Sequence, residues 1–321
     1  MRVGLDVSPL DQTRAGTARY LEQLEQLEDV ELVRLAFRGR NRAATVVRDA
    51  IWYPLGLPRH ARRLRLDVLH CPTFRGPLST SVPLVVTVHD LAVLRHPDMF
   101  NLWTRHYSRL YVSRVVRTAT KVIAVSEFTR RELVELLSTP EEKILVIPNG
   151  VAPVFTPEGP AAEGDYVLAV ATLEPRKNLA RAREAAERAG VELRVAGERG
   201  WGGVDVNGWV GRVSDEQLAA LYRGARCLVY PSLYEGFGLP VLEAMACGTP
   251  VVTSAEGATG EVAGDAAVLV DPRDVASITA GIQAAEERRD ELRRLGFERA
   301  RGFGWERVAQ ETAGVYREVA A

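Results

Sequence analysis

The stretch that decides the fold is YPSLYEGFGLPVLEAMACGTPVV, residues 230–252. A short apolar strand leads into a glycine-containing loop, and Pro240 then stands where a helix favours proline, in its first turn. The helix ends before Gly248, a residue type that commonly terminates helices, and a second apolar strand follows. This order of strand, loop, helix and strand is typical of the βαβ unit from which parallel sheets are built.

The same alternation of short apolar runs and longer helical patterns extends from this stretch to both ends of the chain. Strands are predicted at residues 3–7, 30–37, 68–70, 84–89, 121–125, 144–147, 166–171, 192–196, 227–230, 250–253 and 267–270. Helices are predicted at residues 18–27, 103–118, 127–137 (with Ser126 as its cap), 179–189, 215–225, 240–246, 276–295 and 305–319. The pattern predicts an α/β protein of two Rossmann-like, doubly wound domains that face each other across a central cleft.

Proline and glycine are concentrated between Pro148 and Gly164, which is typical of a linker. The predicted organisation is an N-terminal domain at residues 1–150, a linker at 151–164, a C-terminal domain at 165–304 and a closing helix at 305–321. The length agrees, because 321 residues are too many for one ordinary domain and fit two of about 150 residues each.

The composition excludes several classes of protein. Hydrophobic residues make up 46% of the chain and charged residues 26%, values that exclude a disordered or fibrous protein. No run of about 18 apolar residues is present, and the N-terminus is typical of a first strand rather than a signal peptide. Cys71, Cys227 and Cys247 form no C-x-x-C pair, so we predict neither a zinc site nor a disulfide framework, and we expect buried thiols in a cytoplasmic protein.

Charge is unevenly distributed, because residues 1–150 carry a surplus of Lys and Arg and residues 151–321 a surplus of Asp and Glu. The basic residues concentrate in two clusters, which are Arg59, Arg62, Arg63 and Arg65, and Arg105, Arg109, Arg114, Arg117 and Lys121. A solvated helix face explains such clusters, and the alternative is a surface that meets an anionic membrane from its inner face or a phosphate-bearing acceptor. Nucleic acid is not an expected partner, since no reading motif or interleaved aromatic residue accompanies the basic residues.

The loop and the helix start within residues 230–252 carry candidate chemistry. Backbone amides of the loop and the N-terminus of the helix form a cradle suited to an anion such as a diphosphate. Glu235 lies in the loop and Glu243 one turn into the helix, so the two carboxylates can address different ends of one ligand. An ordinary βαβ turn with a surface glutamate is the alternative, and Val241 stands where the dinucleotide-binding fingerprint has its third glycine.

The complete stretch resembles family 4 of the GT-B glycosyltransferases, in the form E-G-F-G-L-P-x-L-E-A-M-A-C-G with two glutamates eight positions apart. Five further segments resemble that family in the same order, namely TVHDL (87–91), VSEFT (125–129), VIPNGV (146–151), LEPRKNL (173–179) and GRVSDEQLAALY (211–222). The resemblance implies the GT-B architecture, with an acceptor-binding N-terminal domain, a donor-binding C-terminal domain and a last helix that crosses back onto the first domain. It also implies transfer with retention at the anomeric carbon.

The resemblance implies roles for individual residues. Glu235 would contact the donor sugar, Glu243 the ribose of the nucleotide, and Arg176 and Lys177 the diphosphate. Two fixed cations can stabilise the negative charge that develops on the leaving group without a metal. His89, at the end of the strand predicted at 84–89, is assigned to substrate positioning or electrostatics, and a purely structural histidine is the alternative.

Further donor contacts are implied at Gly16, Gly236, Phe237, Gly238 and Leu239. The chain departs from the family at Ala18 and Ala171, where relatives often carry glycine. No D-x-D sequence of the kind that holds a metal on the diphosphate in other glycosyltransferases is present. We therefore predict no metal site and no cofactor beyond the donor substrate itself.

The predicted function is metal-independent transfer of a hexose from a nucleoside-diphosphate sugar to a glycan or lipid-linked acceptor. The segments at 87–91, 146–151 and 173–179 most resemble the mannosyltransferase-like branch, so GDP-mannose is the first donor to test. Two alternatives stay open. One is a nucleotide-sugar epimerase, and the other is a non-catalytic subunit that binds a nucleotide sugar in a polysaccharide-synthesis complex.

Overall fold

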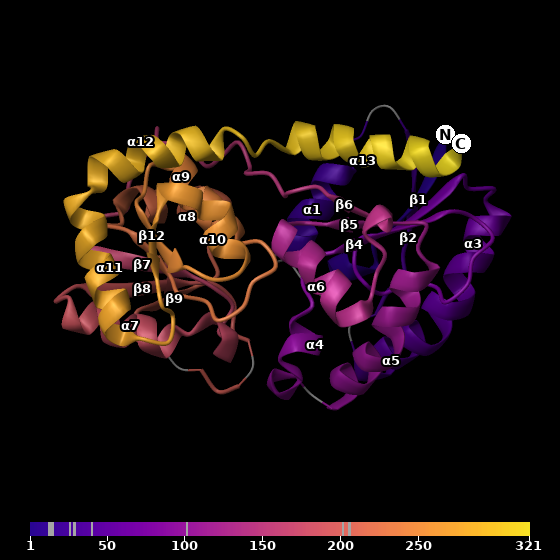
Figure 1. The fold of residues 1–321 in the computed structure, drawn as a ribbon, viewed down its shortest axis with the longest axis horizontal. Coiled ribbons are helices and arrows are strands. Elements are labelled where there is room, and N and C mark those ends of the chain that lie inside the picture. The colour runs from indigo at the N-terminus through magenta and orange to yellow at the C-terminus, as the bar shows by residue number, and fades with distance from the viewer. Residues whose placement is uncertain are drawn as a thin grey trace. The chain divides into compact units, whose positions relative to one another are not determined.

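The computed structural model describes residues 1–11, 16–25, 27, 30–39, 41–100, 102–200, 202–204 and 207–321. The chain divides into two compact units (Figure 1). The N-terminal unit comprises residues 1–149 and 305–321, and the C-terminal unit comprises residues 150–304. Each unit contains one six-stranded sheet whose paired strands are parallel, with helices on both faces, which confirms the predicted α/β class and the two doubly wound sheets.

The sheet of the N-terminal unit has the strand order β2-β1-β3-β4-β5-β6. Its strands are β1 (Arg2–Asp6), β2 (Glu31–Leu35), β3 (Val68–Cys71), β4 (Leu84–Val88), β5 (Lys121–Ala124) and β6 (Ile144–Val146). The four central strands are almost entirely buried, because helices cover both faces of the sheet, and their continuous apolar sequences follow from that position.

The helices of this unit form two layers. One layer comprises α2 (Arg42–Val47), the π-helical segment η2 (Arg48–Gly56), α3 (Leu57–Arg63), α4 (Ala92–Arg95), α5 (Leu102–Thr118) and α6 (Glu127–Leu137). Side chains from η2, α3, α5 and α6 share one hydrophobic core with β3, β4 and β5. The opposite layer contains α1 (Gly16–Leu24) and α13 (Trp305–Ala320), and α13 contacts both α1 and β3.

The sheet of the C-terminal unit has the order β12-β11-β10-β7-β8-β9. Its strands are β7 (Tyr166–Val170), β8 (Glu192–Ala196), β9 (Trp209–Gly211), β10 (Leu228–Tyr230), β11 (Val251–Ser254) and β12 (Val268–Val270). Read from β9, the order is the 3-2-1-4-5-6 arrangement of dinucleotide-binding folds. In such a sheet the direction of winding reverses between the two central strands, which are here β7 and β10.

The helices of the C-terminal unit also form two layers. Helices α7 (Leu179–Arg188) and α11 (Val275–Glu287) pack together on one face and share a core with the sheet. The other face carries α8 (Asp215–Gly224), α9 (Leu239–Ala246), α10 (Ala258–Ala263) and α12 (Arg289–Ala300). Ser214 and Gln217 cap α8 reciprocally, which satisfies two of the amides that a helix start leaves unpaired.

Several predicted elements differ from the observed ones. Most boundaries shift by one or two residues, so His89 lies one position beyond β4, and Gly16 is the first residue of α1 rather than part of the preceding loop. The single helix predicted at 276–295 is two helices, α11 and α12, separated at Arg288. The helical run at 42–63 was not predicted, because Pro54 and Gly56 interrupt its pattern.

Two smaller expectations, the cap at Ser126 and the burial of the cysteine thiols, are confirmed. The hydroxyl of Ser126 accepts a hydrogen bond from the amide of Thr129 and caps α6. All three cysteine thiols are buried and form no disulfide. Among the helices that the structure describes, none is long and apolar enough to cross a membrane.

Candidate active site

The carboxyl ends of β7 and β10 mark the point in the C-terminal unit where the winding of the sheet reverses. These strands are neighbours in the sheet, but β7 leads into α7 on one face and β10 leads into α9 on the other. The two loops contact each other directly, beyond the carboxyl ends of the strands, where ligands of doubly wound sheets bind. The loop at residues 171–178 follows β7, and the loop at residues 231–238 follows β10.

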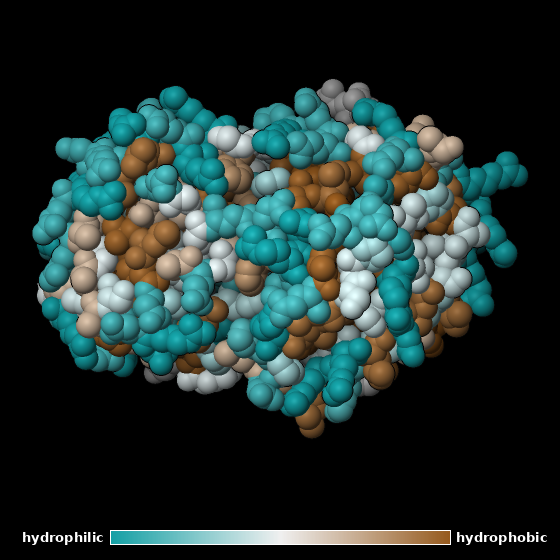
Figure 2. Space-filling view, viewed as in Figure 1, coloured by the Kyte–Doolittle hydropathy of each residue, from teal (hydrophilic) through white to brown (hydrophobic). Residues whose placement is uncertain are grey.

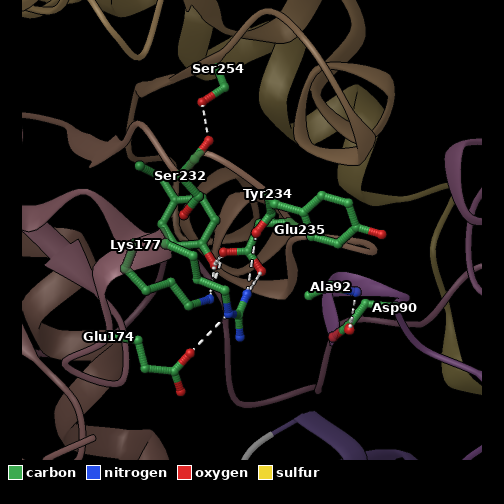
Figure 3. Close-up of polar contacts among 10 residues, drawn as sticks. Asp90, Ala92, Glu174, Lys177, Ser232, Tyr234, Glu235 and Ser254 are labelled. Atoms are coloured by element: carbon green, nitrogen blue, oxygen red, sulfur yellow. Dashed lines mark hydrogen bonds and ion pairs between the residues drawn. The ribbon is translucent and has the colours of Figure 1, made fainter. Parts of the chain in front are cut away.

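Four charged side chains from these loops form one cluster (Figure 3). The Glu235 carboxylate lies between two cations, with Oε1 2.5 Å from Lys177 Nζ and Oε2 3.0 Å from Arg176 Nη1. The hydroxyl of Tyr230 donates to the same Oε1 at 2.8 Å and accepts from Lys177 at 3.0 Å. Arg176 Nε contacts the carboxylate of Glu174 at 2.8 Å. The cluster holds two positive and two negative charges when all four groups are ionised.

Burial and ion pairing act on these groups in opposite directions. Burial alone would raise the pKa of Glu235, but Lys177 and Arg176 outweigh it and lower that pKa to about 2. Burial lowers the pKa of Lys177 despite its contact with Glu235. Burial likewise raises the pKa of Glu174, although Arg176 opposes the shift. Strong perturbations of this kind are typical of functional sites in clefts.

Backbone and amide contacts hold the loops in register. The amide of Leu233 donates to the carbonyl of Arg176 at 2.8 Å. The side chain of Asn178 donates to the carbonyls of Pro231 at 2.9 Å and Pro272 at 2.6 Å, and so connects the loops that follow β7, β10 and β12. Asn178 stands at the N-cap position of α7, but its side chain makes no capping hydrogen bond to that helix. Its backbone adopts a left-handed conformation, with φ of 59°, that turns the side chain away from the helix.

The glycine-containing loop enters α9 as the sequence predicts. Gly238 has φ of 111°, and a Cβ there would lie 3.0 Å from the side chain of Thr259, so this position requires glycine. Leu239 is the first residue of α9, and its neighbour Pro240 lies in the first turn. Phe237 is buried and packs edge-on against Phe303. The helix N-terminus and the loop amides are therefore placed beside the charged cluster, where they favour an anion.

The second glutamate of the pattern, Glu243, lies inside the C-terminal unit and is only 2% exposed. Its Oε2 accepts a hydrogen bond from the hydroxyl of Tyr222, at 2.9 Å, across the α8–α9 contact. The sequence analysis missed Tyr222 as a partner, although it ends the segment at 211–222 that resembles the family. A carboxylate held in this way can accept hydrogen bonds from vicinal hydroxyls without reorienting.

His89 and Gly16 belong to the N-terminal unit. The Nε2 atom of His89 lies 3.1 Å from the carbonyl oxygen of Pro72, and its ring packs edge-on against Tyr20. Burial lowers the pKa of His89 to about 4, although Asp90 and the Pro72 carbonyl oppose the shift, so the imidazole is neutral near pH 7. A neutral ring whose Nε2–H donates to Pro72 keeps Nδ1 as its acceptor nitrogen.

The structure thus brings Arg176 and Lys177 into direct contact with Glu235 where the winding of the sheet reverses. Gly236, Phe237, Gly238 and Leu239 lie in the same loop and helix start. Glu174 and Tyr230, which complete the cluster, were not predicted as site residues, although both lie inside the quoted segments at 173–179 and 230–252. Among the described residues, no group of three or more His, Cys, Asp or Glu side chains could hold a metal ion.

Comparisons with known proteins agree over both units. A family model described as "Glycosyltransferase Family 4" matches residues 13–155, and one described as "Glycosyl transferases group 1" matches residues 155–301. The O-antigen chain mannosyltransferase B of Escherichia coli is 33% identical over 285 residues, which cover 78% of this chain and 74% of the relative. The MMP alpha-(1->4)-mannosyltransferase of Mycolicibacterium hassiacum is 33% identical over 301 residues, covering 81% and 72%.

Solved structures share the fold at lower identity. Sucrose-phosphate synthase from Thermosynechococcus elongatus superposes with a TM-score of 0.78 at 20% identity, covering 99% of this chain and 98% of that one. Anabaena HepE in complex with UDP and glucose superposes with a TM-score of 0.74 at 17% identity, covering 99% and 100%.

The ion pairs of Glu235 predict a specific dependence of stability on pH. Its folded pKa of about 2 lies below the ordinary value of 4.5, so the stabilisation is complete above pH 4.5 and is lost as the pH falls towards 2. We expect Glu235→Gln to lower the free energy of unfolding at pH 7 by on the order of 3 kcal/mol. The difference from the wild type should shrink between pH 4.5 and pH 2 in urea titrations.

The matched control is Glu158→Gln, which alters an exposed carboxylate and should change stability by less than about 0.5 kcal/mol at either pH. An equal difference between wild type and Glu235→Gln at pH 7 and pH 3 would show that the carboxylate is not ion-paired.

Proposed function

The chain belongs to family 4 of the GT-B glycosyltransferases, and we propose that it transfers a hexose from a nucleoside-diphosphate sugar to an acceptor hydroxyl, with retention at the anomeric carbon. The observation that carries this proposal is the cluster of Arg176, Lys177 and Glu235 at the carboxyl ends of β7 and β10. A diphosphate leaving group needs cations, and a donor sugar needs a fixed hydrogen-bond acceptor. The cluster supplies both at one place in the C-terminal unit.

The donor is proposed to bind with its diphosphate against Arg176, Lys177 and the start of α9, and with its ribose at Glu243. As the glycosidic bond breaks, negative charge grows on the β-phosphate, and the two cations stabilise it more strongly in the transition state than in the ground state. Glu235, released from part of its pairing with the cations, accepts hydrogen bonds from hydroxyls of the donor sugar. This scheme uses no metal ion and no further cofactor.

Mannose is the proposed sugar and GDP the proposed nucleotide. Support comes from two relatives at 33% identity, both of which are named mannosyltransferases. A uridine nucleotide is the alternative, because HepE was solved with UDP and with UDP-glucose. The proposed acceptor is a glycan or a lipid-linked glycan, bound mainly by the N-terminal unit near His89.

The roles proposed for the cluster predict that nucleotide binding and turnover respond oppositely to one substitution. In Glu235→Gln, the two cations lose their competing carboxylate, so the dissociation constant for GDP should stay unchanged or fall. Turnover of GDP-mannose, followed as GDP release, should decrease at least about 100-fold, because the sugar loses its charged contact. Titration calorimetry and a coupled GDP assay on the same preparation measure both quantities.

Glu187→Gln, on the exposed face of α7, is the matched control and should leave both values unchanged. Wild-type turnover in Glu235→Gln would remove this residue from the active site. Tight donor binding without turnover in the wild-type chain, with any acceptor, would instead favour a non-catalytic nucleotide-sugar-binding subunit.

A peripheral contact with an anionic membrane is proposed for the helical run at 42–63. Val46, Val47, Ile51 and Leu55 are between 41% and 53% exposed on its outward side. Arg59, Arg62 and Arg63 are exposed on the next two turns. On the visible face of the N-terminal unit, hydrophobic patches lie among long hydrophilic side chains (Figure 2). Apolar side chains beside arginines suit the interface of an anionic bilayer.

Sedimentation with vesicles tests this surface. We expect the wild-type chain to sediment with vesicles of phosphatidylglycerol and phosphatidylcholine, and the double variant Ile51→Asn, Leu55→Asn to bind them at least about 10-fold more weakly. Val210→Asn is the control, because Val210 is 45% exposed in the other unit. Equal sedimentation of all three proteins would refute this surface.

A further inference from the structure

Four buried polar side chains of the N-terminal unit form one continuous hydrogen-bonded chain. His70 Nδ1 lies 2.6 Å from the hydroxyl of Tyr316, and His70 Nε2 lies 2.9 Å from the hydroxyl of Thr87. Thr87 in turn lies 2.9 Å from the hydroxyl of Tyr20. These side chains come from β3, α13, β4 and α1, and each residue is fully buried. This series of hydrogen bonds therefore joins two strands of the sheet to both helices that cover this face.

Burial keeps the His70 imidazole of this hydrogen-bonded series neutral. Burial, with a smaller effect from the neighbouring His89, lowers the pKa of His70 to about 3. A neutral ring has one donor and one acceptor nitrogen, so either direction of the chain satisfies both ring nitrogens and the hydroxyl of Thr87. In either direction His70 has a single tautomer. A buried polar chain in which each link is made holds its side chains in one arrangement.

Tyr20 connects this chain to His89. Its hydroxyl ends the chain, while its ring packs edge-on against the His89 ring, with 5.0 Å between the ring centroids and an angle of 83°. The other fixed contact of His89 is the one between Nε2 and the carbonyl of Pro72, at 3.1 Å. The Tyr20 ring also lies near the ring of Trp305, the first residue of α13, with 6.4 Å between the ring centroids.

We propose that Tyr20 is a positioning residue for His89, and that α13 sets the position of Tyr20 through Tyr316 and Trp305. The anchored hydroxyl prevents the Tyr20 ring from rotating away, and the ring edge then holds His89 with Nε2–H on Pro72 and Nδ1 available as an acceptor. This inference rests on the proposed function in one respect, namely that His89 uses Nδ1 as a hydrogen-bond acceptor in it. The inference extends the proposed function by giving a role to α13, the helix that begins immediately after the C-terminal unit.

A purely structural role for this series of hydrogen bonds leads to a different prediction. If it only attaches α13 to the sheet, loss of one link lowers stability and leaves the His89 ring as it is. If Tyr20 positions His89, the same loss changes the tautomer and the titration of His89. It also lowers kcat for the donor while leaving the KM for the donor nearly unchanged, because His89 lies in a different unit from the donor cluster.

The experiment uses the full chain labelled with ¹⁵N-histidine, in wild-type form and as Tyr20→Leu, Tyr20→Phe and Tyr166→Phe. Long-range ¹H–¹⁵N spectra report the tautomer and the pKa of each histidine. Wild-type His89 should be a neutral Nε2–H tautomer that does not titrate above pH 5. Tyr20→Leu removes the ring contact, so His89 should show mixed tautomers and a pKa that moves towards 6.5, with kcat lowered at least about 10-fold and KM within about 3-fold.

Tyr20→Phe keeps the ring and removes the hydroxyl, and it should lie between wild type and Tyr20→Leu in both readouts. Tyr166→Phe is the matched control, because it removes a buried tyrosine hydroxyl that donates to Leu221 at 2.8 Å in the other unit. It should lower stability without changing His89. Wild-type His89 spectra in Tyr20→Leu would overturn the proposal. Absence of turnover in the wild-type chain would refute the proposed function, while the spectra would still decide whether Tyr20 positions His89.

Discussion

The carboxylate of Glu235 determines how the proposed donor site can work, because it is buried between Lys177 and Arg176 and contacts both cations. Removing one partner of a buried ion pair is costly, and a well-packed apolar replacement is often as stable as the pair itself. The cluster is therefore poorly explained by stability alone. Its position at the reversal of winding between β7 and β10, where ligands of doubly wound sheets bind, agrees with a role in catalysis.

The cluster also has a chemical consequence for the unliganded protein. With Glu174 and Glu235 ionised, the charges of Arg176 and Lys177 are balanced, so the cluster does not hold two uncompensated buried cations. In the proposed mechanism, a donor diphosphate competes with Glu235 for the same cations. In the proposed mechanism this exchange frees the Glu235 carboxylate to contact the sugar at the moment the diphosphate binds. The binding energy of the nucleotide thereby prepares the site for the sugar.

Much of the fold could be predicted because strand and helix patterns are local. The βαβ alternation, the cap at Ser126 and the loop at 231–238 each depend on residues close in sequence. The π-helical segment at 48–56 could not be predicted, because its Pro54 and Gly56 usually end helices, and tertiary contacts of Tyr53 and Leu57 with the sheet compensate for them.

The candidate site likewise contains features that could be predicted from nearby residues and features that depend on distant ones. Glu235, Arg176 and Lys177 stand in motifs that could be recognised, and their contact follows from the neighbouring positions of β7 and β10. The partners of Asn178 could not be predicted, because they come from the loops after β10 and β12. The link between His70 and Tyr316 joins residues 246 positions apart, and no periodic pattern indicates it.

The most direct test of the donor site is thermal unfolding of the full chain with GDP, UDP, ADP and their mannose, glucose and N-acetylglucosamine forms, each with and without EDTA. A ligand at 100 times its Kd adds about 2.7 kcal/mol to the free energy of unfolding, which gives a clear rise in Tm. The account predicts a rise with GDP and GDP-mannose that EDTA leaves unchanged and that Arg176→Gln reduces. No rise with any nucleotide, or a rise that EDTA abolishes, would contradict a metal-independent donor site built on this cluster.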